Sequence, residues 1–205
     1  MRVIAVDREL PEVWTLSPAV HALHAGELVV LPTDTIYGLA CDPWNRQAVG
    51  RLYTSKGMLK TKRCAVLCSD LKQVGSVARA ISDDAFRFMR SHLPGPYTVL
   101  LNASSNVPRQ ATGKRKTIGV RMPSHDVPTT LVEEFGGPIM VTSLPHWDQE
   151  GDMDPVAIAE TVLRLRPAVV IDQGPAAAEP STVVDFTKKP PELVRMGKGP
   201  LDLMV

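Results

Sequence analysis

Polar side chains stand at the ends of several apolar stretches, and they are the best candidates for chemistry in this sequence. They are Thr33, Thr35, Tyr37, Arg121, Ser143, Ser181, Thr182 and Arg195. A hydroxyl can donate and accept a hydrogen bond, and an arginine can hold a carboxylate or a phosphate through two parallel hydrogen bonds. Because ligands of open α/β sheets bind beyond the strand ends, the pattern predicts a site for a small polar ligand. For any single hydroxyl, capping of a strand end is the alternative interpretation.

Several familiar catalytic and cofactor motifs are absent. No GxGxxG or GxxxxGK[ST] loop is present, so the sequence lacks the two common phosphate-binding loops of nucleotide-binding proteins. The five histidines cannot be assembled into a Ser-His-Asp triad. Cys64 and Cys68 are spaced for one face of a strand rather than for a zinc site, so we expect no bound metal.

Positive charge is segregated along the chain, although the net charge is only +1. Neither the segment 43–69 nor the segment 85–125 contains an acidic residue. Their basic residues are Arg46, Arg51, Lys56, Lys60, Lys62, Arg63, Arg87, Arg90, Arg109, Lys114, Arg115, Lys116 and Arg121. This distribution predicts a basic face that attracts the phosphates of a nucleotide or a nucleic acid. A solvated lysine and arginine surface is the alternative.

The bulk composition predicts one soluble domain spanning residues 1–205. The chain is 44% hydrophobic and 22% charged, which is enough to bury a sizeable core. Three cysteines are too few for a disulfide framework and suit a reducing compartment. No signal peptide or membrane span is evident, so we expect a cytoplasmic protein with no membrane partner.

The elements that must position the polar residues alternate between strands and helices. Strands are predicted at 2–6, 28–31, 64–68, 98–102, 117–121, 139–142, 168–172, 181–186 and 192–196. Helices are predicted at 18–26, 45–57, 71–80, 83–92, 128–135 and 154–165, with Ser17, Ser82 and Asp154 as caps. Residues 103–116 and 143–154 are predicted to be weakly ordered. The pattern indicates an α/β fold with an α+β tendency, in which a twisted mixed sheet is flanked by helices.

Six motifs then appear in one order. They are "LPTDTIYGLACD", "RLYTSKG", "KTIGVRMPSH", "PIMVTS", "PSTVVDF" and "LVRMG". Their order resembles that of the YrdC-like family, which contains the threonylcarbamoyl-AMP synthases. The resemblance covers about residues 28–197, within a motif-bearing core of about 12–198. It implies a single YrdC-like domain with a large concave basic surface.

The resemblance also implies an activity. Synthases of this family condense L-threonine, bicarbonate and ATP into threonylcarbamoyl-AMP and pyrophosphate, for the N6-threonylcarbamoyladenosine of tRNA. ATP would be a substrate, Mg²⁺ would accompany its phosphates, and no tightly bound cofactor is implied. ATP or AMP, L-threonine and bicarbonate are therefore the expected ligands.

Site residues follow from the same resemblance, position by position. Lys56 and Arg121 are implied as catalytic residues, and they also belong to the substrate-binding set with Thr33, Thr35, Tyr37, Ser181 and Thr182. Nucleotide binding is implied for Ser143, Arg195 and Arg63. Asp34 is expected to cap its turn, while Tyr37 and Gly38 are expected to shape the pocket wall.

Two positions depart from the synthase pattern. Met58 replaces the arginine of the K-x-R pair, and Pro145 replaces the asparagine of the S-A-N motif. The chain is therefore most similar to the YciO-like branch, for which weak synthase activity is one hypothesis. The second is a module that binds double-stranded RNA or tRNA, with Arg109, Lys114, Arg115 and Lys116 as contacts. The third is a hydrolase or transferase that acts on threonylcarbamoylated tRNA.

Overall fold

The computed structural model describes residues 1–7, 11–55, 64–112, 116–144, 154–161, 166–176 and 179–201. Within them the strands are β1 (Arg2–Ala5), β2 (Val29–Leu31), β3 (Gly38–Cys41), β4 (Ala65–Leu67), β5 (Ala78–Arg79), β6 (Tyr97–Ala103), β7 (Thr117–Arg121), β8 (Ile139–Ser143), β9 (Val169–Asp172), β10 (Thr182–Asp185) and β11 (Glu192–Arg195). The helices are α1 (Val13–His24), α2 (Arg46–Ser55), α3 (Leu71–Val77), α4 (Asp83–His92), α5 (Arg109–Thr112), α6 (Asp126–Phe135) and α7 (Pro155–Thr161).

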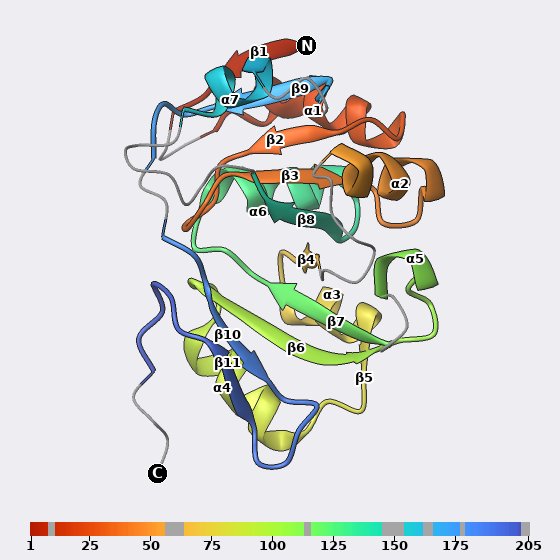
Figure 1. Ribbon diagram of the computed structural model, residues 1–205, viewed down its shortest axis with the longest axis vertical. Coiled ribbons are helices and arrows are strands. Elements are labelled where there is room, and N and C mark those ends of the chain that lie inside the picture. Colours follow the sequence, from red (N-terminus) through yellow and green to blue (C-terminus); the bar gives the residue numbers. More distant parts are fainter. Residues whose placement is uncertain are drawn as a thin grey trace.

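All of these strands belong to one mixed sheet, as predicted. Its order is β1-β9-β2-β3-β8-β4-β7-β6-β10-β11, and β5 pairs with β6. The pairs β1–β9, β9–β2, β4–β7 and β6–β10 are parallel, whereas β2–β3, β3–β8, β8–β4, β7–β6 and β10–β11 are antiparallel. Figure 1 shows the sheet running from β1 at the top to the β10–β11 hairpin at the bottom.

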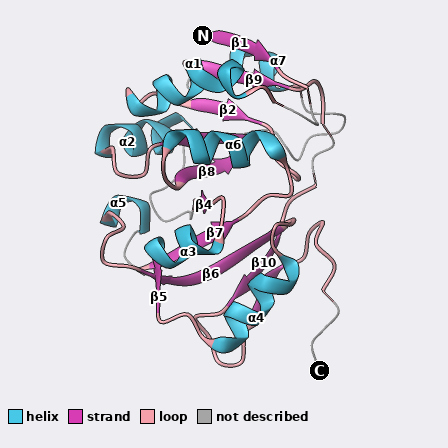
Figure 2. Ribbon diagram, turned by 180° about the vertical axis from the view of Figure 1, so that it is seen from behind, coloured by secondary structure: helices cyan, strands magenta, loops and turns pink. Residues whose placement is uncertain are grey.

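Four helices cover one face of the sheet. Figure 2, the view from behind, shows α1 and α6 over its upper half, and α3 and α4 over its lower half. Leu16 and Leu23 of α1 and Leu131 of α6 are buried with Val29 and Ile171 of the sheet. Burial of such side chains contributes about 1.5–3 kcal/mol each, so these faces hold the helices in place.

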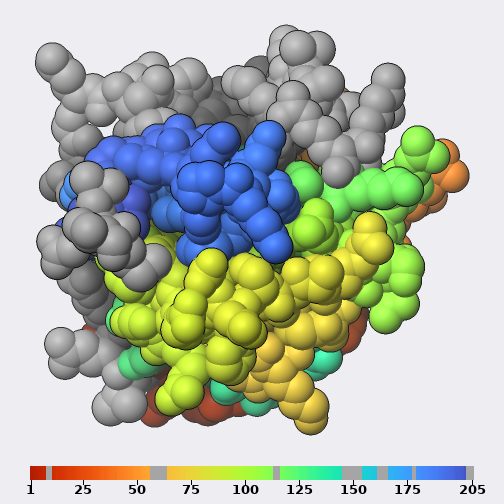
Figure 3. Space-filling model, turned by 90° about the horizontal axis from the view of Figure 1, so that it is seen from below, coloured from red at the N-terminus to blue at the C-terminus, as the bar shows by residue number. Residues whose placement is uncertain are grey.

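In the lower half of the sheet, every second residue of a strand packs on α3 and α4. Phe88 and Met89 of α4 are buried in one cluster with Val99 and Leu101 of β6. At the lower end of the molecule, α4 (yellow-green) and the β10–β11 hairpin (blue) lie side by side (Figure 3). Because successive side chains of a strand point to opposite faces, Thr98 and Leu100 face away from these helices.

Several element boundaries differ from the sequence prediction. The predicted helix 71–80 ends at Val77, because Ala78 and Arg79 pair with β6 as strand β5. Helix α1 begins at Val13 instead of Pro18, so that Pro18 lies inside the helix and Ser17 is not its cap. The fully buried Leu16 explains this extension, because its side chain packs into the core. Pro18 lies inside the helix and donates no backbone hydrogen bond there. Ser82 and Asp154 do cap α4 and α7, since they accept hydrogen bonds from Ala85 N and from Val156 N and Ala157 N.

Strand β3 was not predicted. All four of its residues are buried, so it lacks the apolar–polar alternation that marks a strand with one wet face. It pairs with β2 and β8, with Gly38 opposite Ser143. A Cβ at Gly38 would lie 2.5 Å from Val141 Cγ2, so glycine is required for this close pairing.

The segment 103–116, predicted to be weakly ordered, contains the short helix α5. No helix in the described ranges is long and apolar enough to cross a lipid bilayer.

Candidate functional site

A hollow of about 420 Å³ lies on the lower half of the sheet, on the face that α3 and α4 do not cover. It reaches from β3 and β8 across β4 and β7 to β6, β10 and β11. The polar and charged residues that line it are Thr33, Thr98, Arg121, Thr142, Ser143, Ser181, Asp185 and Arg195. Its size falls within the range of small-molecule sites, about 300–1,000 Å³. The hollow therefore gathers most of the strand-end residues that the sequence singled out.

Gly119 of β7 keeps the floor of this hollow open. A Cβ there would lie 3.2 Å from Thr98 Cγ2 and 3.3 Å from Leu100 Cδ2, both of which line the hollow. Any side chain at this position would push against the walls and occupy part of the space.

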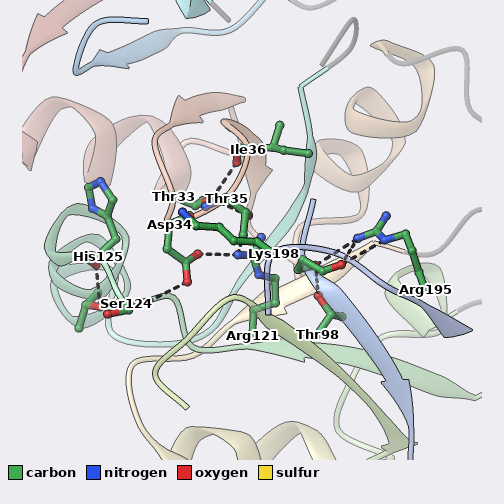
Figure 4. Close-up of polar contacts among 12 residues, drawn as sticks. Thr33, Asp34, Thr35, Ile36, Thr98, Arg121, Ser124, His125, Arg195 and Lys198 are labelled. Carbon is green, nitrogen blue, oxygen red and sulfur yellow. Dashed lines mark hydrogen bonds and ion pairs between the residues drawn. The ribbon is translucent and has the colours of Figure 1, made fainter. Parts of the chain in front are cut away.

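Thr33 of the loop between β2 and β3 and Arg121 line one end of the hollow, and Asp34 and Thr35 contact Arg121 from behind it. We call these four residues the amino-acid end. Thr33 Oγ1 donates to Ile36 O at 2.8 Å and accepts from Thr35 N at 3.1 Å. It also lies 3.1 Å from Thr35 Oγ1. The hydroxyls thus fold the loop on itself, and Figure 4 shows them beside the Arg121 side chain.

Arg121 is buried at this end and paired with Asp34. Its Nη2 donates to Asp34 Oδ1 at 2.6 Å and to Thr35 Oγ1 at 2.8 Å. The Asp34 Oδ2 atom accepts from Ser124 N at 3.1 Å. Asp34 was expected to cap its own turn; instead its carboxylate joins the turn to the end of β7 and to the residues before α6.

Burial sets the electrostatics of the pair. The side chains of Arg121 and Asp34 are only 10% and 7% exposed. Burial lowers the pKa of Arg121, and the Asp34 carboxylate opposes that change by stabilising the charged form. The Arg121 Nε atom is buried and finds no acceptor among the described residues. An uncompensated buried donor of this kind is costly in free energy.

A second group of lining residues, which we call the hydroxyl end, is formed by Thr98, Ser181 and Arg195 at β6, β10 and β11, the strands that follow β7 in the sheet order. Arg195 donates to Ser181 O from Nη2 at 2.7 Å and from Nε at 3.1 Å, and its Nη2 lies 3.2 Å from Ser181 Oγ. Ser181 Oγ lies 2.8 Å from Thr98 Oγ1. The sequence prediction missed Thr98, although it follows the same rule as the others: it is a hydroxyl near the start of an apolar strand.

Three of the described residues predicted to bind substrate do not line this hollow: Thr35, Tyr37 and Thr182. Thr182 is fully buried, and its hydroxyl donates to Gly199 O at 2.6 Å and accepts from Gly197 N at 3.0 Å. It alternates with Ser181 and Val183, so its side chain points to the other face of β10. Tyr37 Oη donates to Gly174 O at 2.8 Å and accepts from Gln173 N at 3.0 Å. The hydroxyls of Thr182 and Tyr37 therefore bond to the protein itself in this structure, and a ligand contact through either remains a prediction.

A second hollow of about 570 Å³ lies behind the β2–β3 loop. It is lined by Tyr37, Asp34, His125, Gln173 and Lys198, among others, and it shares Thr33 with the first hollow. The loop is therefore a partition between two hollows, and its conformation affects both.

Several predicted site residues lie outside the described residues. They are Lys56, Arg63, Lys114 and Arg115, together with the departures Met58 and Pro145. Arg109 and Lys116 are described and exposed, but they line neither hollow. Any nucleic-acid contact through them concerns a separate surface.

The three cysteines, Cys41, Cys64 and Cys68, are free and buried. Burial raises the pKa of Cys68 to about 12 and raises that of Cys41 as well. These two therefore stay as thiols at neutral pH, and a thiol is a poor nucleophile compared with a thiolate.

Comparison with known proteins places this arrangement among relatives. A family model for the Sua5/YciO/YrdC domain, described as "Telomere recombination", matches residues 21–197. The crystal structure of YciO from Escherichia coli superposes with a TM-score of 0.89 at 30% identity, covering 98% of both chains.

A second relative connects the fold to a ligand. The crystal structure of Pyrococcus abyssi Sua5 complexed with L-threonine superposes with a TM-score of 0.88 at 31% identity, covering 96% of this chain and 58% of that one. The threonylcarbamoyl-AMP synthase of P. abyssi is 31% identical over 205 residues, which are 98% of this chain and 59% of the synthase. These findings confirm the predicted resemblance, and the chain belongs to the Sua5/YciO/YrdC family.

Proposed function

We propose that the first hollow binds L-threonine and ATP, and that the chain makes threonylcarbamoyl-AMP from them and bicarbonate. The observation that carries this proposal is Arg121, a buried cation that lines a hollow of about 420 Å³ together with the hydroxyl residues Thr33, Thr98 and Ser181. Its surroundings suit an amino acid, because they combine a cation for the carboxylate with hydroxyls for the remaining polar groups. P. abyssi Sua5, a relative of similar fold, was crystallised with L-threonine.

The proposed chemistry needs positioning and positive charge more than a covalent nucleophile. The threonine amine and bicarbonate form a carbamate with loss of water. A carbamate oxygen then attacks the α-phosphorus of ATP, and pyrophosphate leaves. Phosphoryl-type transfer of this kind is catalysed by alignment of the reactants and by donors aimed at the developing charge. Buried thiols such as Cys68 have no part in it.

The residues divide between the two ends of the hollow. At the amino-acid end, Arg121 holds the threonine carboxylate, while Thr33 and Thr35 lie near the carbamate. At the hydroxyl end, Ser181 and Arg195 receive the nucleotide, and Ser143, which also lines the hollow, is a further predicted nucleotide contact. Lys56 and Arg63 remain predicted contacts for the carboxylate or phosphates, and Mg²⁺ enters with ATP.

Product formation tests this proposal. The protein is incubated with ATP, L-threonine and labelled bicarbonate, and the labelled adenylate is measured by mass spectrometry. We expect product from the unaltered protein and from Arg87→Ala, which removes an exposed arginine on α4, and none above background from Arg121→Ala. Absence of product from the unaltered, folded protein would contradict the proposal.

A further inference from the structure

The last described residues form a segment, Gly197–Pro200, that we call the C-terminal strap. It lies across the start of β10 and is fixed there by hydrogen bonds. Thr182 Oγ1 donates to Gly199 O and accepts from Gly197 N, while Lys198 N donates to Pro180 O at 2.8 Å. Tyr97 Oη donates to Pro200 O at 2.7 Å. The strap is therefore held along its whole length.

Close packing at two glycines also fixes the strap. A Cβ at Gly197 would lie 2.1 Å from Pro180 O, and a Cβ at Gly199 would lie 2.5 Å from Tyr97 Cε1. Only glycine permits so close an approach to the backbone of residues 180–181 and to the Tyr97 ring. The strap is thus a rigid support for whatever its side chains hold.

Lys198 extends from this support to the amino-acid end. Its Nζ donates to Asp34 O at 2.7 Å, and Figure 4 shows the side chain lying across the β2–β3 loop. The carboxylate of the same Asp34 holds Arg121 and Ser124. One residue of the loop is therefore fixed through its main chain by the strap and through its side chain by β7.

We propose that Lys198 is a positioning residue for the amino-acid end, which the C-terminal strap holds in place so that Asp34 keeps Arg121 aimed at the substrate. The inference rests on the proposed function. Lys198 does not line the first hollow, so its effect passes through Asp34. A binding residue such as Arg121 needs support of this kind, because its side chain must be held in the geometry that the ligand requires.

The strap also joins the two ends of the hollow. The strap is hydrogen-bonded to Thr182, the neighbour of Ser181, and its Lys198 contacts the loop that contains Thr33 and Thr35. This gives Thr182 a role that its buried hydroxyl supports: it anchors the strap. Loss of either anchor, Thr182 or Lys198, is therefore expected to loosen the same loop.

Kinetics of Lys198→Met test the proposal, with Lys188→Met as the matched control because Lys188 is an exposed lysine in the β10–β11 turn. We expect the KM for L-threonine to rise about 2- to 13-fold, the value of one net hydrogen bond, with kcat and the KM for ATP changed less than about 2-fold. Lys198→Arg keeps a cationic donor and is expected to restore the KM. An equal rise in both KM values, or no rise, would overturn the proposal.

A second measurement needs no substrate and separates this proposal from the proposed function. Hydrogen exchange of the amides of residues 33–37 is compared between the unaltered protein, Lys198→Met, Thr182→Val and the double variant. We expect both single variants to accelerate exchange about 2- to 13-fold, and the double variant to add little, because both act through one strap. Unchanged exchange, or fully additive effects, would refute the tether even if synthase activity is present. If synthase activity is absent, accelerated exchange still supports the tether.

Discussion

The hydroxyl of Tyr37 ties the β2–β3 loop to the chain after β9, and its removal gives a stability change that follows from the structure. Tyr37→Phe keeps the ring, which is 1% exposed, and removes only the oxygen. That oxygen donates to Gly174 O at 2.8 Å and accepts from Gln173 N at 3.0 Å. The variant therefore leaves one carbonyl and one amide without their partner in a partly buried place.

A group left unsatisfied in this way costs about 1–3 kcal/mol when it is fully buried. Since Gln173 and Gly174 are only half-buried, water can replace part of the loss, and we expect a total of about 1–3 kcal/mol. For a chain of this size that corresponds to a fall in Tm of about 2–12 °C. Tyr97→Phe is the comparison, because its hydroxyl donates to the carbonyl of the exposed Pro200, and we expect at most about 1.5 kcal/mol.

Urea unfolding followed by circular dichroism gives both free energies of unfolding. The reasoning would be refuted if Tyr37→Phe lost less than about 0.5 kcal/mol, or less than Tyr97→Phe, with an unchanged dependence on urea.

Three further predictions concern the buried ion pair, pH and nucleic acid. Asp34→Ala leaves Arg121 as an unpaired buried cation and should lower the free energy of unfolding by about 3–5 kcal/mol, measured by urea titration. The control is Asp84→Ala, which breaks the exposed Arg87–Asp84 pair and should cost less than about 1 kcal/mol in the same titration. Burial raises the pKa of Tyr37 from 10.0 to about 12 and raises that of Tyr53 too, so the unfolded chain loses these protons first. The contribution of these groups to the free energy of unfolding should be complete below pH 10 and should fall as the pH rises towards 12. The fall should be less steep in Tyr37→Phe. A free energy of unfolding that does not change over this pH range would argue against buried tyrosine hydroxyls. If Arg109 and Lys116 contact phosphates, the affinity for tRNA, measured by filter binding, should fall as the salt concentration rises. In the Arg109→Ala/Lys116→Ala double variant the affinity should fall less steeply with salt concentration. An affinity that does not depend on salt would exclude this mode of binding.

Most of the sheet could be predicted because its strands are short apolar runs between turn residues. Two strands were not predicted. Strand β5 (Ala78–Arg79) fell inside the predicted helix 71–80, and β3 is buried on both faces and begins with a glycine, which is typical of a loop. The start of α1 was misplaced for a different reason. Ser17–Pro18 is a good local start signal, but burial of Leu16 overrides that preference.

The residue types of the site could be predicted, whereas their pairing could not. Arg121 and Asp34 are 87 residues apart, and Thr98 and Ser181 are 83 residues apart. No local pattern connects such positions; only the sheet order brings β7 and β6 next to each other and β10 alongside. For the same reason the sequence could not separate Ser181, which faces the hollow, from Thr182, which anchors the C-terminal strap on the other face.

The most direct test of the central claim is calorimetric titration of the protein with L-threonine, alone and with ATP present. We predict saturable binding by the unaltered protein and by Arg87→Met. Binding should be about 10- to 150-fold weaker in Arg121→Met, because that variant removes a charge-assisted hydrogen bond to the carboxylate. Equal affinity in a folded Arg121→Met, or no binding by the unaltered protein even with ATP, would contradict an amino-acid site at Arg121.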